Sequence, residues 1–136
     1  MHREPSEAAD DALVARVRER VFAAIAQEQA ARLHTVRAAD DGWEIVSEGV
    51  QRKILQRDLS SQSCLMRLAP GARVAGHHHT QDEECVVLDG SLRIGSHLVL
   101  GTGDFHLAPA GTTHEETTSE TGALVYLRGA PEPAAC

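Results

Sequence analysis

The chain has 136 residues and a net charge of −7 at pH 7 with histidine taken as neutral, and aromatic residues make up 3% of it. This length provides one domain with a single hydrophobic core. The acidic balance, with no basic stripe, argues against a nucleic-acid partner. No apolar run is long enough to span a membrane, and the N-terminus lacks the apolar core of a signal peptide.

Three cysteines, Cys64, Cys85 and Cys136, form no C-x-x-C pair. An odd number of unpaired cysteines favours reduced thiols over a disulfide framework. We therefore expect a cytoplasmic protein.

The N-terminal part, residues 1–40, is predicted to be a helix and a linker. The helix is expected to run from Asp10 to about residue 31, with Asp10 or Asp11 as its N-cap. Val14, Val17 and Val21 lie on one helical face, which Ala24 and Ile25 extend. This face is expected to pack on the rest of the subunit or across a dimer, and a separate protein partner is the alternative.

Residues 41–130 have an all-β pattern, and residues 131–136 form a tail. Apolar segments at 50–55, 63–68, 86–88, 91–94, 97–100 and 123–127 are separated by turns every six to twelve residues. Asp89-Gly90 and Gly95-Ser96 are predicted to be two-residue hairpin turns. Many short strands with such turns indicate a sandwich or a small barrel.

The stretch from Gly71 to Gly90 contains a histidine run followed by an acidic residue. On an extended strand, His77 and His79 point to the same face. Glu83 follows a short bend and opens an apolar strand that is expected to return beside the first. Two imidazoles and a carboxylate on adjacent strands are typical of a metal site. The alternative is a surface histidine run or an affinity tag, although tags lie at termini and this run is internal.

Together with a second stretch, this one resembles the paired motifs of the cupin superfamily. The first motif, G-x5-H-x-H-x3-E-x6-G, is matched at all its fixed positions, and the second, G-x5-P-x-G-x2-H-x3-N, at all but the last, where Thr118 replaces Asn. The matching residues are Gly71, His77, His79, Glu83, Gly90, Gly103, Pro109, Gly111 and His114. The resemblance implies a double-stranded β-helix, the jelly-roll barrel of cupins, and a metal bound by His77, His79, Glu83 and His114.

Residues 43–129 resemble more narrowly the C-terminal cupin domain of ChrR-type anti-sigma factors. That resemblance implies a zinc-binding barrel that senses oxidative stress. In that family an N-terminal H-x3-C-x2-C module holds the sigma factor, but no such cysteines follow His34. Sigma-factor binding is therefore not supported, and the chain resembles a stand-alone version of the barrel.

Three imidazoles and one carboxylate suit one divalent transition-metal ion per chain. Four ligands would complete the coordination of a tetrahedral zinc ion, whereas six-coordinate iron or manganese would keep two positions for other ligands. Nickel and copper are further candidates for the metal. Strand alternation predicts that Cys85 faces the interior with Glu83, either near the metal or as a small buried residue. His78 and Glu84 should point away. His106 is expected to point inward beside the metal or to lie at the rim.

We therefore expect a non-catalytic sensor or small-ligand-binding module that forms a homodimer. The alternative is a small metal-dependent dioxygenase of the non-haem iron type. An isomerase or decarboxylase has less support, because His106 and Glu84 are its only acid–base candidates. No catalytic residue is assigned.

Overall fold

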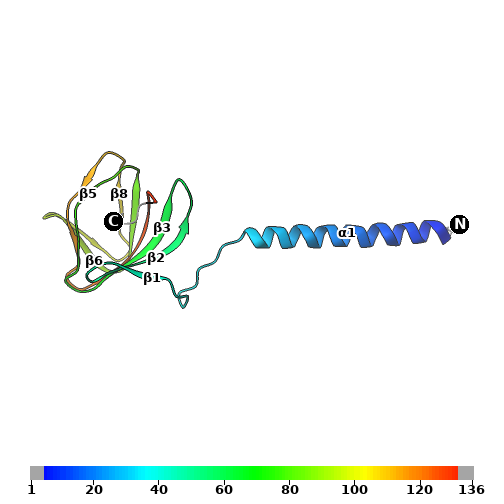
Figure 1. The fold of residues 1–136 in the computed structure, drawn as a ribbon, viewed down its shortest axis with the longest axis horizontal. Helices are drawn as coiled ribbons and strands as arrows, with labels where there is room; N and C mark the ends of the chain where they lie inside the picture. Colours follow the sequence, from blue (N-terminus) through cyan, green and yellow to red (C-terminus); the bar gives the residue numbers. More distant parts are fainter. Residues whose placement is uncertain (1–4, 132–136) are drawn as a thin grey trace. The chain divides into compact units, whose positions relative to one another are not determined.

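The computed structural model describes residues 5–131, which divide into two compact units, with the boundary in the sequence between Ala39 and Asp40. The first unit contains the helix, and the second contains every strand (Figure 1). The elements are α1 (Pro5–Arg32), β1 (Trp43–Ser47), β2 (Val50–Arg57), β3 (Gln62–Leu68), β4 (Arg73–Val74), β5 (His77–His78), β6 (Glu83–Ile94), β7 (Leu98–Gly101), β8 (Phe105–Ala108), β9 (Thr113–His114), β10 (Thr117–Thr118) and β11 (Ala123–Gly129). The predicted tail, residue 131 apart, lies outside the described residues.

Helix α1 begins five residues before the predicted start. It opens at Pro5, so the predicted N-caps Asp10 and Asp11 lie inside the helix, and their predicted capping role is wrong. Proline is favoured in the first turn, and alanines at positions 8 and 9 continue the helix at little cost. Described by itself, α1 leaves its apolar side chains exposed, among them Leu13, Val14, Val17, Val21, Phe22 and Ile25.

The second unit is an antiparallel barrel. Its main sheet has the order β1-β2-β3-β11-β6-β10-β4, with β7 and β8 also paired to β6, and β5 pairs with β9 in a separate ribbon. Alternate residues of β11, Ala123, Val125 and Leu127, are buried, as a strand with one face on a core requires. The predicted all-β jelly-roll barrel with one N-terminal helix is confirmed.

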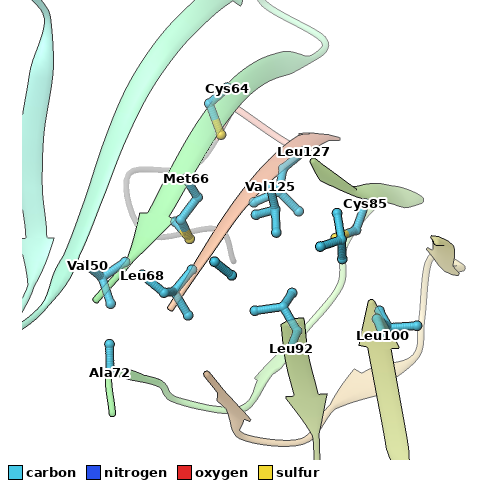
Figure 2. Packing of buried hydrophobic residues seen from close by; sticks show 12 residues of the cluster. Val50, Cys64, Met66, Leu68, Ala72, Cys85, Leu92, Leu100, Val125 and Leu127 are labelled. Atoms are coloured by element: carbon cyan, nitrogen blue, oxygen red, sulfur yellow. The ribbon is translucent and has the colours of Figure 1, made fainter. Parts of the chain in front are cut away.

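The core fills the interior of the barrel with small and medium-sized side chains (Figure 2). One row of directly opposite residues crosses the sheet from Arg52 on β2 through Met66 on β3 and Val125 on β11 to Val87 on β6. All four are buried. Because directly opposite residues share a face, Arg52 lies on the same inner face as the apolar core.

The predicted hairpin at Asp89-Gly90 is wrong. Strand β6 continues through both residues from Glu83 to Ile94. It pairs with β8 and β11 up to Gly90 and with β7 and β10 beyond it. Gly90 has φ +77°, and the pairing with β11 shifts register just before it. An Asp-Gly pair suits a bulge and bend as well as a turn, because both need a residue with positive φ.

Two other local predictions are corrected in the same region. The turn at Gly95 has three residues instead of two, because Ile94 pairs with Leu98. Strand β6 also does not return beside the histidine strand. Residues from the second motif, in β10, lie between β4 and β6, and β5 pairs with β9. The two motifs therefore interleave in space.

Candidate metal centre

The three motif histidines lie on one two-stranded ribbon. His77 on β5 is directly opposite His114 on β9. The ribbon continues beyond these strands, because His79 N–H donates to the Thr112 carbonyl at 2.9 Å and Gly111 N–H donates to the His79 carbonyl at 2.8 Å. Backbone pairing between the two motifs therefore sets the spacing of the imidazoles.

Gly76 allows this pairing to be close. A Cβ at this position would lie 2.6 Å from the carbonyl oxygen of His114, well inside van der Waals contact. Any larger residue would push β5 away from β9. The glycine just before the first histidine is thus needed for close approach of the two backbones.

The ligand atoms of His77, His79 and Glu83 all lie within 4.8 Å of one another, and this group could hold a metal ion. The His114 ring centroid lies 5.5 Å from that of His77 and 5.4 Å from that of His79. Glu83 reaches the same place from the first residue of β6, where it is buried. The structure thus brings together all four predicted ligands, three as a tight group and His114 beside them.

Hydrogen bonds select which nitrogen of two rings is available. His77 Nδ1 donates to the Ala75 carbonyl at 3.1 Å, and His114 Nδ1 donates to the Glu115 carbonyl at 2.9 Å. A neutral imidazole that donates from Nδ1 keeps its lone pair on Nε2. Hydrogen bonds from the other ring nitrogen to backbone carbonyls also orient metal-bound histidines in proteins.

Among the residues that the structure describes, the buried Nε2 atoms of His77 and His79 have no hydrogen-bond partner. An unsatisfied buried polar atom costs roughly 1–3 kcal/mol, so native structures usually avoid it. Two such atoms in one cluster with a buried carboxylate are what a bound cation would satisfy. The donor set of imidazoles and a carboxylate fits a transition-metal ion.

Burial favours the neutral forms of His79 and His114. It lowers the pKa of His79 from 6.5 to about 4, helped by the nearby His77 and His114, and it also lowers the pKa of His114. Burial raises the pKa of Glu83, against the opposing effect of His77. The 3.9 Å between His79 Nδ1 and Glu83 Oε2 is too long for a hydrogen bond, and a neutral His79 forms no ion pair.

The metal-free protein should therefore lose stability in acid. Between pH 6.5 and 4 the unfolded chain protonates this histidine and the folded chain does not, so the contribution of His79 is full above pH 6.5 and is lost as the pH falls to about 4. The loss is on the order of 3 kcal/mol. Urea unfolding of metal-free protein at pH 7 and pH 4.5 measures it. The loss should shrink in His79→Gln but not in the exposed His78→Gln, and equal losses in both variants would contradict the assignment.

A small cavity of about 30 Å³ lies next to the cluster, with room for about two water molecules. Glu83, Cys85, His106 and His114 line it together with apolar core residues. The predicted inward orientation of Cys85 is confirmed, and burial raises its pKa to about 12, so the thiol stays protonated. The His106 ring lies 5.9 Å from the His114 ring.

The outward orientation predicted for the two neighbouring polar residues also holds, because His78 and Glu84 are exposed. Sequence reasoning missed Thr117, which is buried in the cavity wall with its hydroxyl 3.4 Å from His114 Nδ1. The cupin motif marks the neighbouring Thr118, which stands at the position of its Asn. No motif marks Thr117, and its inward orientation follows from pairing with Val74 and Ile94.

The family model described as the ChrR cupin-like domain matches residues 31–131. The chain belongs to this family. The predicted family is thereby confirmed. The family model covers the whole barrel of this ChrR-like cupin and the linker before it. A comparison with curated proteins gives no significant match.

Solved structures share the fold of this ChrR-like cupin. An RmlC-like cupin from Shewanella frigidimarina superposes with a TM-score of 0.65 at 20% identity, covering 74% of this chain and 92% of that one. The anti-sigma factor ChrR, in complex with SigE from Rhodobacter sphaeroides, gives 0.60 at 24% identity, over 68% of this chain and half of the other. An acetylacetone dioxygenase from Acinetobacter johnsonii gives a TM-score of 0.66 at 15% identity, covering 72% of this chain and 74% of that one. No helix in residues 5–131 has the length and apolarity needed to cross a membrane.

Proposed function

We propose that this protein is a metal-binding cupin module that works as a sensor or binds a small ligand. One ion per chain, zinc, is held by His77, His79, Glu83 and His114. The observation that carries this proposal is the pair of buried, unsatisfied Nε2 atoms beside a buried carboxylate. Zinc would supply a charge that satisfies these groups and closes the site with four ligands.

The surroundings of the cluster favour a module over an enzyme. The inner cavity is small and largely apolar. Apart from Glu83 and His114, the ionisable groups that line it are Cys85, whose thiol stays protonated, and His106. A general acid–base mechanism would thus depend on His106 alone.

In the sensor interpretation, oxidants act by releasing the ion. Zinc loss after peroxide or singlet-oxygen treatment, followed with a chromogenic chelator, should be slowed in Cys85→Ser relative to the wild type. Equal release from a cysteine-free, fully loaded variant would exclude the thiol and leave the imidazoles as the oxidised groups.

A dioxygenase is the second candidate, because His106 lies beside His114 and an acetylacetone dioxygenase shares the fold. Protein reconstituted with zinc, ferrous, manganous, nickel or cupric ion should show no oxygen uptake above buffer with acetylacetone, small thiols or carboxylates. Oxygen uptake by the wild type that disappears in His77→Ala would overturn the proposed non-catalytic module in favour of a dioxygenase.

We also propose a homodimer. The apolar side chains of α1 are exposed within its own unit, and β1 is an edge strand of the main sheet. Apolar faces and sheet edges of this kind are usually covered. Light scattering at micromolar concentration should give twice the monomer mass. Val17→Glu or Val21→Glu should weaken the dimer, whereas Ala26→Glu on the opposite face of the helix should not. A monomer mass for the wild type would exclude the homodimer.

The remaining proposals concern location and partners. Cys64 and Cys85 are buried, in keeping with reduced thiols in a cytoplasmic protein, whereas Cys136 lies outside the described residues. We propose no nucleic-acid or membrane partner for so acidic a chain. A sigma-factor partner has no support, since the sequence lacks the H-x3-C-x2-C module.

A further inference from the structure

A buried arginine lies on the inner face of the barrel and has no part in the metal cluster. Arg52 is 5% exposed, in the row of inward residues that includes Met66. Charged side chains are rarely buried to this degree unless they are paired. Arg52 pairs with Glu44, directly opposite on β1, whose Oε1 accepts hydrogen bonds from Arg52 Nε at 2.8 Å and from Nη2.

Arg52 lines a second cavity, which is larger than the one beside Glu83. This cavity has a volume of about 290 Å³. Its wall includes the apolar side chains of Val46, Val50, Met66 and Val74, and Arg52 and His77 are the residues in it that can carry charge. Small-molecule sites are typically apolar with a few placed polar groups and start at about 300 Å³, so a ligand here must be small.

We propose that this cavity binds a small aliphatic carboxylic acid, with the carboxylate on Arg52 and the hydrocarbon part against Val50 and Val74. The inference rests on the proposed ligand-binding function and names its ligand class. A guanidinium presents a planar fork that matches a carboxylate in shape and charge. The apolar wall excludes a second charge on the ligand, because nothing there would compensate it.

Glu44 acts as a competitor for the same cation. Its side chain is 51% exposed, whereas that of Arg52 is 6% exposed, so Glu44 neutralises the arginine from the solvent side. A ligand carboxylate must share or displace this interaction. Removing the charge of Glu44 should therefore strengthen ligand binding, whereas removing the guanidinium should abolish it.

The cavity also connects the ligand to the metal centre. His77 lines it, and the ring of His77 is fixed by the carbonyl of Ala75, another residue of the cavity wall. An acid held at Arg52 therefore lies beside one of the proposed metal ligands. Binding of the ion does not require the acid, so the two events can be measured separately.

Isothermal titration of the full chain with butanoate and with its neutral isostere butanamide tests the proposal, on zinc-loaded and on metal-free protein. We expect butanoate to bind both forms and butanamide to bind at least tenfold more weakly. Arg52→Gln should weaken butanoate binding at least tenfold, since a charge-assisted hydrogen bond is lost. Glu44→Gln should tighten it several-fold, and the exposed Arg93→Gln should change it less than twofold.

Folding of each variant is checked by circular dichroism, and Arg52→Lys provides a second variant that keeps the charge but loses the fork. Weaker binding to Arg52→Lys than to the wild type supports the proposal. Butanoate binding that is absent from the wild type, equal for the amide, or unchanged in Arg52→Gln and Arg52→Lys overturns it. Binding only to zinc-loaded protein would place the acid on the metal and also overturn it. Zinc content measured on the same samples shows separately whether the metal proposal fails.

Discussion

Replacing His79 with alanine should reduce bound metal from about one ion per chain to nearly none. His79 is 5% exposed and its Nε2 has no partner among the described residues, so the ion is its proposed partner. Loss of a residue that only orients a ligand costs 10–100-fold in metal affinity, and loss of a ligand itself should cost at least about 100-fold. His114→Ala should behave in the same way.

His78→Ala is the matched control, because it removes an imidazole from the same strand, where the side chain is exposed. Elemental analysis of untagged protein should show near-stoichiometric zinc in the wild type and in this control. A chelator should lower the melting temperature of both, because an ion present at about 1,000 times its Kd adds roughly 4 kcal/mol of stability. Full metal occupancy in His79→Ala would refute the ligand assignment.

The fold should survive these substitutions. The core cluster, which includes Val50, Met66, Val87 and Val125, is apolar and does not contain the four proposed ligands. Metal-free His79→Ala should even be more stable than the metal-free wild type at pH 5, because the proton that His79 takes up only in the unfolded chain no longer favours unfolding. Retained circular dichroism with lost metal thus separates the site from the scaffold.

Side-chain direction could be predicted from the sequence wherever it depended on strand alternation alone. Glu83 and Cys85 are buried and Glu84 is exposed, as a period of two requires. Pairing between distant segments could not be predicted in this way. That β9 lies beside β5, and β10 between β4 and β6, depends on contacts between the two motifs, and neither segment carries a local signal for its partner.

Arg52 shows a different kind of failure. A charged residue in a strand is normally expected to face solvent, so the sequence pattern does not mark Arg52 as a site residue. Its position two residues from both Val50 and Ile54 was a usable signal, because all three share a face of β2. The helix start was missed for a simpler reason: two acidic residues resembled an N-cap although the preceding residues also favour a helix.

Gly90 shows why a local turn signal can mislead. Its φ of +77° satisfies the preference behind an Asp-Gly turn, yet the chain continues as β6 and bends. The bend lets one strand pair with β8 and β11 in its first half and with β7 and β10 in its second. Glu83 and the second half of β6 are thereby held in one continuous element.

Gly90→Ala should be among the most destabilising single substitutions in the barrel. A Cβ at this position would overlap the carbonyl oxygen of Gly122 and lie 3.0 Å from the Cα of Ala123, both backbone atoms that cannot rotate away. Gly71 has nearly the same φ, +81°, but a Cβ there would have no atom within 4 Å. Gly71→Ala therefore measures the conformational cost alone, about 1–2 kcal/mol.

The difference between the two variants isolates the effect of the close contact between β6 and the turn before β11. Gly90→Ala should cost about 1–3 kcal/mol more than Gly71→Ala in urea unfolding, because overpacking against backbone forces the strands apart. It should also weaken zinc binding, since β6 carries Glu83 and displacing the strand moves that carboxylate away from the imidazoles. Equal destabilisation in the two alanine variants would mean that the turn at Gly122 yields freely, and the bend would then be set by β6 itself.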